Sequence, residues 1–356
     1  MLEIDGSQHS GSGSIVRLAA AYAALTGTAV HVVNARAKRR PKPGLRRQHC
    51  MALQAVRDLV GGDLTGASVD SQEFTFRPGD ETPKGRHSFD IGSAGSATAL
   101  GLALVPLLAL RGDGVQVELR GGVFQDFAPS PYHLQQVITP LLARMGLQVE
   151  VSVDRPGYVP TGQGVLRVEV APTDRLTPLQ LGAADRPERF WGIASASHLA
   201  DRQVSSRMAD SARQVLTRKG FDAPIDVVDD TTAAQPGAGF AVFAELPGGT
   251  RLGADGAGAP RRPAERIGRQ ATQELLDDLA TGATVDRHAA DQLLIFTALA
   301  DGVSTYRAPA ITGHMHSAAW LAALFLDVDV DFADDGTATV AGGAFPLSPD
   351  LARPAG

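Results

Sequence analysis

The stretch VPLLALRGDGVQVEL (105–119) decides the fold class, because it joins two kinds of periodicity. Its first half is an apolar run typical of a buried helix, and after a Gly-Asp-Gly turn its second half alternates apolar and polar residues like a half-buried strand. The same order recurs over 139–153 and 320–332, and a related pattern runs from Ala52 to about residue 79. Because the spacing is uneven, the recurrence predicts a duplicated α/β unit and not a solenoid.

Residues 183–270 interrupt this repetition with a segment rich in Arg, Asp, Gly and Pro. The change of composition on both sides predicts a small inserted domain. The large domain would then comprise residues 1–182 and 271–345, followed by a tail over 346–356. Within and just after the insertion we expect a helix over 198–219 that ends at Gly220, a strand pair at 240–246 and a Gly/Pro-rich loop over 253–263. A helix over 264–279 would then return the chain to the large domain.

Composition excludes several classes of protein. The chain has 356 residues, 44% of them hydrophobic, and can bury a large core. No window approaches the roughly 18 consecutive apolar residues that span a bilayer, and no secretory signal is evident, so we expect a cytoplasmic protein. Cys50 is the single cysteine, which rules out an internal disulfide and a Cys-based metal site. A net charge of −6 argues against a protein that coats nucleic acid indiscriminately.

Positive charge is nevertheless concentrated in RAKRRPKPGLRR (36–47). Pro41 and Pro43 prevent one continuous helix there, so the segment is expected to form a loop. Arginine forks on a backbone fixed by proline would hold a phosphate in one geometry. A solvated surface loop remains the alternative. The basic residues are Arg36, Lys38, Arg39, Arg40, Lys42, Arg46 and Arg47.

Two turns of small residues open apolar helices, one in DGSQHSGSGSIVR (5–17) and one in FDIGSAGSATALGLALVPLL (89–108). Backbone amides and the positive end of a helix dipole suit a phosphate at such a turn. Neither is a Walker A loop, since Gly-Lys-Ser/Thr is absent. Plain strand-to-helix connection and helix packing explain the small residues equally well. A third turn, in GYVPTGQGVLRVEV (157–170), also fits an ordinary hairpin.

The C-terminal part offers the candidate catalytic groups. Asp291 and Gln292 begin an apolar helix, where an Asp is often only a cap or a favourable charge at the helix N-terminus. His314 and His316 lie at the head of another helix. A metal site formed by both is disfavoured, because positions i and i+2 of a helix point in different directions.

Taken in order, these segments resemble the RNA 3′-terminal phosphate cyclases, whose motifs DGxxxxGGG, RAxRxKPGLxxQH, IGSAGSxT, GxxPxGGG and ADQL precede a C-terminal histidine. The resemblance runs from residue 6 to about residue 340. It implies an α/β (α+β) fold with a large domain of three βαβαββ units and a small α/β domain inserted before the last. The matching positions are Asp5-Gly6, 42–45, Gln48-His49, 91–96, Gly157, Pro160, Gly162, Gly164, 290–293 and His314.

The resemblance also implies a reaction. ATP, with Mg²⁺ or Mn²⁺, would adenylate His314, AMP would pass to an RNA 3′-phosphate, and the 2′-hydroxyl would close a 2′,3′-cyclic phosphate. No residue is assigned as a metal ligand, and a homodimer is expected by resemblance alone. The implied nucleotide-binding residues are Asp291, Gln292, His288, Leu252, Ser10 and Gly13. The implied phosphate- and RNA-binding residues are Arg17, Arg36, Arg40, Arg47 and Gln48, with Arg40 preferred to Arg39 although this loop has one residue more than the family pattern.

Three departures from the family keep other functions open. Ser10 stands where the family has Glu, His288 where Tyr is common, and Leu252 where an aromatic residue stacks on adenine. The missing carboxylate at Ser10 favours an altered paralogue that binds RNA ends or RNA-processing partners without cyclising them. An enolpyruvyl transferase-like enzyme is the third hypothesis, against which the C-terminal histidine segment and the insertion count.

Overall fold

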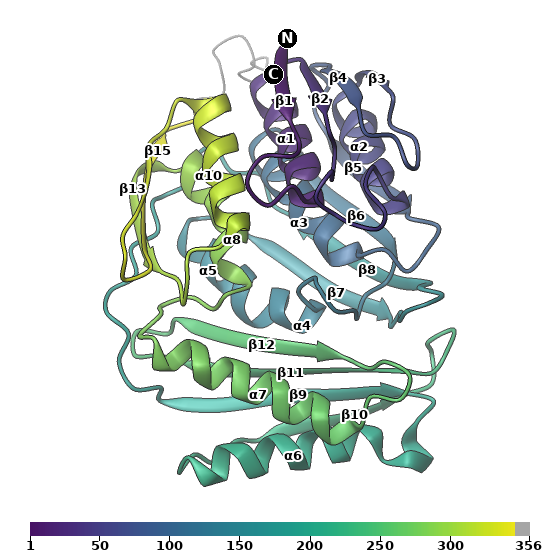
Figure 1. Cartoon of the computed structure of the whole chain (residues 1–356), viewed down its shortest axis with the longest axis vertical. Helices are drawn as coiled ribbons and strands as arrows, with labels where there is room; N and C mark the ends of the chain where they lie inside the picture. The colour runs from purple at the N-terminus through teal and green to yellow at the C-terminus, as the bar shows by residue number, and fades with distance from the viewer. Residues whose placement is uncertain (346–356) are drawn as a thin grey trace.

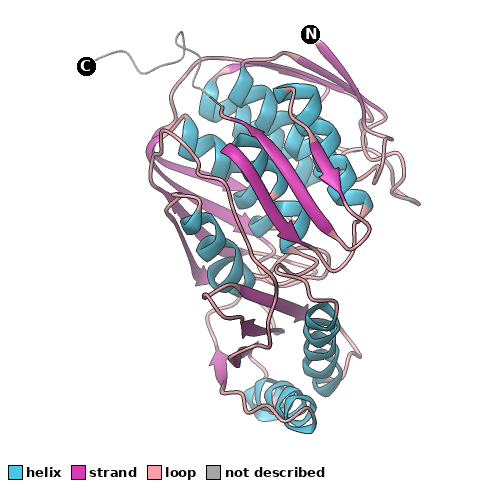
Figure 2. Ribbon diagram, turned by 90° about the vertical axis from the view of Figure 1, so that its left-hand side faces the viewer, coloured by secondary structure: helices cyan, strands magenta, loops and turns pink. Residues whose placement is uncertain are grey.

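The computed structural model describes residues 1–345, and the tail expected over 346–356 lies outside the described residues. Three sheets surround a bundle of helices in the larger unit, and a fourth sheet with two long helices forms a smaller unit below it (Figure 1). In a view turned by 90°, the larger unit has its helices in the middle and its strands on the outside (Figure 2). The predicted α/β fold is confirmed.

The first two repeats have the same topology. Their strand orders, β1-β2-β4-β3 and β5-β6-β8-β7, are equivalent, and in each the first two strands are parallel. The first consists of β1 (Leu2–Asp5), α1 (Gly13–Thr26), β2 (Val30–Val33), α2 (Arg47–Val60), β3 (Gly62–Thr65) and β4 (Phe74–Pro78). The second consists of β5 (Lys84–Asp90), α3 (Ala97–Leu110), β6 (Asp113–Gly121), α4 (Pro131–His133), the π-helical turn η1 (Leu134–Ile138), α5 (Thr139–Arg144), β7 (Val149–Arg155) and β8 (Gly164–Val170).

The third repeat is split by the smaller unit. Residues 176–181 run parallel to β13, where the amide of Asp301 donates to the carbonyl of Leu176 (2.9 Å) and that of Thr305 to Leu179 (2.8 Å). This segment occupies the place of a first strand, so the insertion lies inside the third repeat and not before it. The repeat continues with α8 (Ala289–Gln292), α9 (Leu294–Leu299), β13 (Asp301–Arg307), α10 (Gly313–Leu326), β14 (Val330–Phe332) and β15 (Thr337–Gly343).

Helix α3 lies at the centre of the larger unit. Every one of its 14 residues is buried, as its apolar composition on all sides requires. Helices α1 and α2 and strands β6 and β8 pack against it, and α10 packs on the far side of α1. The N-terminal ends of α1 and α10 therefore lie next to each other.

The smaller unit has its own core. Its sheet has the order β10-β9-β11-β12, with α6 and α7 on one face. Because α7 packs on α6, β11 and β12, it does not return the chain to the larger unit, and we place the end of the smaller unit near residue 283 instead of 270. Its elements are β9 (Arg189–Ser197), the 3₁₀ turn η2 (Ala200–Arg202), α6 (Val204–Arg218), β10 (Ile225–Asp230), β11 (Gly237–Glu245), β12 (Arg251–Ala257) and α7 (Ala264–Ala280).

Two sequence predictions in this unit need correction. The helix expected from residue 198 begins at Val204, because Gln203 takes a left-handed backbone conformation (φ 51°) after the short turn η2. The loop expected over 253–263 is a strand as far as Ala257, since β12 forms a complete antiparallel ladder with β11. Within residues 1–345, no helix combines the length and apolar character needed to cross a membrane.

Candidate active site

The site forms where the first turns of two helices meet. Ser12 caps α1 and Thr312 caps α10, each with its side-chain oxygen accepting from a backbone amide of the first turn. The amide of Ser10 donates to Oγ of Ser317 (3.1 Å), which joins the turn before α1 to the first turns of α10. The positive ends of two helix dipoles thus lie beside one another, an arrangement that favours an anion.

His314 occupies this junction, in the first turn of α10, with its side chain 40% exposed. Its Nδ1 lies 3.3 Å from Oγ of Ser14 and 3.9 Å from Oδ2 of Asp291. Its Nε2 lies 3.3 Å from Nη2 of Arg39. A guanidinium only donates hydrogen bonds, so Nε2 must be the acceptor and the proton of the neutral ring belongs on Nδ1.

Burial sets the protonation of the His314 and Asp291 pair. Desolvation lowers the pKa of His314, with Arg39 and Arg17 acting in the same direction and Asp291 opposing them. Desolvation raises the pKa of Asp291, against the charges of His314 and Arg17 and the hydrogen bond from Gln292. The imidazole is therefore neutral near pH 7, with an unprotonated Nε2 facing the basic loop.

A chain of serine hydroxyls leads to His314. Oγ of Ser317 lies 2.7 Å from Oγ of Ser10, which lies 3.0 Å from that of Ser12, which in turn lies 2.8 Å from that of Ser14. Ser14 then contacts Nδ1 of His314. Ser10, assigned to the nucleotide from the sequence, thus bonds to protein hydroxyls.

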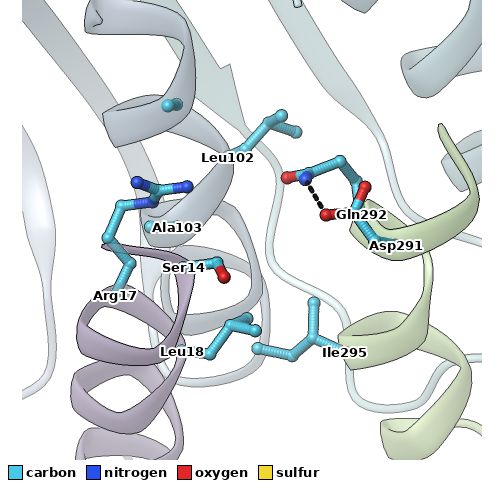
Figure 3. A pocket seen from close by; sticks show the side chains of 9 residues that line it. Ser14, Arg17, Leu18, Leu102, Ala103, Asp291, Gln292 and Ile295 are labelled. Carbon is cyan, nitrogen blue, oxygen red and sulfur yellow. Dashed lines mark hydrogen bonds between the residues drawn. The ribbon is translucent and has the colours of Figure 1, made fainter. Parts of the chain in front are cut away.

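A small pocket lies between α1, α3 and α8, beside His314 (Figure 3). Arg17 projects into it from α1, while Asp291 and Gln292 face it from α8, where Nε2 of Gln292 donates to Oδ2 of Asp291 (3.0 Å). Within residues 1–345 the Arg17 guanidinium makes no hydrogen bond or ion pair, so its donors remain for a ligand.

Asp291 is not the cap of its helix. Oδ1 of Asp286 accepts from the amides of His288 (2.9 Å) and Ala289 (2.8 Å) and so performs that role. The carboxylate of Asp286 also holds the buried ring of His133, whose Nε2 lies 3.0 Å from Oδ2. The sequence reading did not identify either residue. The capping alternative for Asp291 is therefore wrong, whereas its place in the first turn of α8 agrees with the other alternative, a favourable charge at the helix N-terminus.

The basic loop (36–47) folds over the turn that precedes α1. Nζ of Lys38 donates to the carbonyl of His9 (2.8 Å), which brings Arg39 to His314. Arg36 donates to carbonyls of its own loop, 2.5 Å from that of Gly44, and so shapes the loop from within. Arg40, preferred from the sequence, is exposed, and the contact with His314 belongs to Arg39.

Arg47 and Gln48 join α2 to the second small-residue turn. Nη1 of Arg47 donates to the carbonyl of Gly92 (2.6 Å), and Oε1 of Gln48 accepts from the amide of Ser96 (2.9 Å). Both side chains therefore hold the turn over 92–96 beside the basic loop. Close packing explains the glycine at position 13, since a Cβ on Gly13 would lie 2.1 Å from Nε2 of the buried His49.

The other two residues predicted from the sequence to bind the nucleotide, His288 and Leu252, lie farther from His314. His288 borders a cleft between residues 125–128 and α7, and its Nε2 lies 2.6 Å from Oε1 of Glu274. Burial acts to lower the pKa of His288, but the Glu274 hydrogen bond and neighbouring carboxylates outweigh it and raise the pKa to about 9. Leu252 is fully buried in the core of the smaller unit and offers no surface to a nucleotide.

His316 points away from His314. Its ring stacks on His9 (6.0 Å between centroids) and meets Phe332 edge-on (5.2 Å). Ser10 offers only a bonded hydroxyl where the family has a carboxylate. Among the described residues, no group of three or more His, Cys, Asp or Glu side chains is arranged to hold a metal ion.

Comparison with known proteins identifies the family. The family model described as "RNA 3'-terminal phosphate cyclase" matches residues 8–332. Curated relatives of that name include those of Methanopyrus kandleri (36% identity over 93% of this chain and 95% of the relative), Hyperthermus butylicus (39%; 88% of each) and Nitrosospira multiformis (37%; 92% of each). Among solved structures, the enolpyruvyl transferase NikO from Streptomyces tendae aligns with a TM-score of 0.28 and 12% identity over 96% of this chain and 51% of that one, too weak a likeness to carry weight.

The family match covers both the turn around Ser10 and the helix that carries His314, so it includes the whole junction described above. The chain belongs to the RNA 3′-terminal phosphate cyclase family.

Proposed function

We propose that this protein converts an RNA 3′-terminal phosphate to a 2′,3′-cyclic phosphate at the expense of ATP, with His314 as the nucleotide carrier. In the first step Nε2 attacks the α-phosphorus of ATP, the bond to the β-phosphate oxygen breaks, and pyrophosphate leaves. The AMP then passes from the histidine to the RNA 3′-phosphate. Finally the adjacent 2′-oxygen attacks that phosphorus and displaces AMP.

The environment of the two His314 nitrogens is the observation that carries this proposal. Nδ1 faces Ser14 and Asp291, so its proton is oriented away from the basic loop. Nε2 faces Arg39 and carries no proton, because burial holds the pKa of the ring below the ordinary value. A nucleophile needs an unprotonated atom directed at its electrophile, and Nε2 meets that condition at neutral pH.

The surrounding cations suit the charge that develops on phosphorus. The Arg39 guanidinium would give up its contact with Nε2 for a phosphate oxygen, because a charged acceptor makes the stronger hydrogen bond. Arg17 offers free donors in the pocket beside Asp291, and the first turns of α1 and α10 add amide dipoles. Such preorganised donors stabilise a phosphoryl-transfer transition state.

The direct test is formation of a protein–AMP bond. Purified protein is incubated with α-labelled ATP and Mg²⁺ or Mn²⁺, and the products are separated under denaturing conditions. We expect an adduct that is labile in acid and stable in alkali, as a phosphoramidate is. It should transfer AMP to an RNA with a 3′-phosphate and leave an RNA with a 3′-hydroxyl unchanged. Folded protein that forms no adduct with either metal ion would exclude the carrier role.

Ser10 favours a second candidate, a paralogue that binds RNA ends or RNA-processing partners without cyclising them. The position carries a hydroxyl engaged with Ser12 and Ser317 where the family has a metal-binding carboxylate. Absence of the adduct together with retained binding of a 3′-phosphorylated RNA would support this candidate. A cytoplasmic location and a homodimer remain predictions.

A further inference from the structure

A groove lies at the junction of the two units, formed by the β7–β8 turn, the start of α6 and the turn between β12 and α7. Together with the open solvent at its mouth, the space between these segments amounts to about 1340 Å³. In Figure 1 the turn after β7 and the ends of β9 and β12 lie on the same side of the molecule. None of the described residues that line the groove is among those that contact His314.

The lining of this groove is basic although the chain is acidic. Four arginines line it, and no Asp or Glu is among its lining residues within the described chain. The net charge of the whole protein is −6, so a lining with four guanidinium groups, two of them without a carboxylate partner among the described residues, is a local exception. Such a surface attracts a polyanion. The arginines are Arg202, Arg207, Arg261 and Arg262.

The four arginines form two classes. Arg262 is held by both carboxylate oxygens of Asp126 (2.9 and 2.8 Å), and Arg207 by those of Glu265 (2.6 and 2.9 Å). Arg202 and Arg261 are exposed and make no ion pair within residues 1–345. The paired arginines are fixed in place, while the other two carry uncompensated charge into the groove.

Apolar surface lies between these charges. Val159 is 55% exposed, and Pro160 and Pro260 are also exposed at the groove. Flat or rigid apolar surface beside cationic groups is what a single-stranded nucleic acid requires, since its bases need a face to stack on and its backbone needs positive charge. An acidic peptide would use only the charges.

A series of contacts through intermediate residues connects the groove to the active site. The amide of Gly162 donates to the carbonyl of Tyr158 (2.7 Å) and closes the turn that borders the groove. A Cβ on Gly162 would lie 2.7 Å from the carbonyl oxygen of Ser93, so this turn packs on the small-residue turn over 92–96. Arg47 holds that turn through Gly92, and the basic loop of Arg47 also carries Arg39 to His314.

We propose that this groove binds the sugar–phosphate backbone and bases of the single-stranded RNA nucleotides that precede the 3′ end. The inference rests on the proposed function, because it assumes that the RNA terminus lies at His314. Arg202 and Arg261 supply charge for phosphates, and Val159, Pro160 and Pro260 supply apolar surface for bases. The groove thus acts on substrate affinity and takes no part in the transfer of AMP.

The test compares substrates of two lengths. The double variant Arg202→Glu/Arg261→Glu removes the uncompensated charge, and Arg218→Glu/Lys219→Glu is its control. Both control residues are exposed at the other end of the 15-residue helix α6, about 21 Å away at the rise of an α-helix. The substrates are a dinucleotide 3′-phosphate and a 3′-phosphorylated oligouridylate of about ten nucleotides, in the range of single-strand site sizes.

We expect the groove variant to raise KM for the longer RNA about tenfold and to flatten its dependence on salt, with KM for the dinucleotide and formation of the protein–AMP bond unchanged. The control variant should resemble wild type. Equal KM values for the longer RNA in wild type and groove variant overturn the proposal, as does an equal loss in the control. Competition by polyglutamate as strong as that by oligouridylate overturns it in favour of an acidic protein partner.

A protein without cyclase activity can still be tested for RNA binding in the groove. If wild type forms no adduct, the anisotropy of a fluorescent oligouridylate still reports on the groove. Weaker binding by the groove variant than by the control would then support an RNA site, and equal binding would exclude it. Thermal unfolding of each variant shows whether the substitutions leave the fold intact.

Discussion

Nη2 of Arg39 lies 3.3 Å from Nε2 of His314, although the two residues are 275 positions apart in the chain. Since the guanidinium can only donate, the contact identifies Nε2 as the basic nitrogen and places a cationic side chain beside it. Substitutions of His314, Arg39 and Ser14 test this relationship and its surroundings.

His314→Ala should abolish the protein–AMP adduct, because among the described residues only the His314 imidazole contacts both Ser14 and Arg39. His316→Ala should leave most of it, since that ring contacts His9 and Phe332. Labelled ATP and gel analysis measure both variants. Equal loss in the two would mean that the adduct depends on the first turns of α10 as a whole and not on His314.

Arg39→Ala should reduce the rate of adduct formation about 10²-fold, the typical effect of removing one donor from a transition-state site. Arg40→Ala is the matched control, because Arg40 is the next residue of the same loop and is exposed. Single-turnover rates at saturating ATP measure the difference. A larger defect for Arg40→Ala would restore the residue preferred from the sequence.

Ser14→Ala should slow adduct formation about tenfold, as loss of a residue that orients a catalytic imidazole commonly does. The substitution removes the hydroxyl 3.3 Å from Nδ1, which orients the Nδ1 proton. Ser317→Ala, at the far end of the hydroxyl chain, should have a smaller effect. The pH dependence of the rate distinguishes loss of the oriented Nδ1 proton from simple loss of packing around Ser14.

For wild type, burial lowers the pKa of His314, so the rate should fall only as the pH drops below the ordinary value of 6.5. The acid limb of the profile should move in Ser14→Ala, because the proton on Nδ1 has lost its neighbour. An unchanged rate and profile in that variant would contradict the positioning role of Ser14.

The His288–Glu274 pair should make stability depend on pH. The pKa of His288 is about 9 in the folded protein and 6.5 in the unfolded chain, so its stabilising contribution is complete below pH 6.5 and is lost as the pH rises through 9. Because both side chains are about one-third exposed, we expect only about 1 kcal/mol after allowance for solvent screening. Urea unfolding between these pH values measures it.

Glu274→Gln should remove that part of the pH dependence. Glu265→Gln is the control on the same helix, because its partner Arg207 stays charged throughout the range and contributes no slope. A pH slope in Glu274→Gln equal to that of wild type would show that other groups govern stability in this range.

Local patterns in the sequence were sufficient for the repeated unit. Apolar runs followed by alternating residues predicted helix and strand at 105–119, 139–153 and 320–332, and the structure confirms each. Motif order predicted the family, and the family match confirms it. These features depend on residues close together in the chain, whose periodicity is set by helix and strand geometry.

Contacts between distant segments were decided only by the tertiary structure. The sequence could not distinguish Arg39 from Arg40, since the path of a loop containing two prolines determines which side chain reaches α10. It could not show that Ser10 bonds to Ser317, or that α7 packs on the smaller unit. The sequence by itself therefore determined the repeated helix–strand units and the family. Packing decided which side chains meet, because hydrogen bonds and burial depend on distances in space and not on separation along the chain.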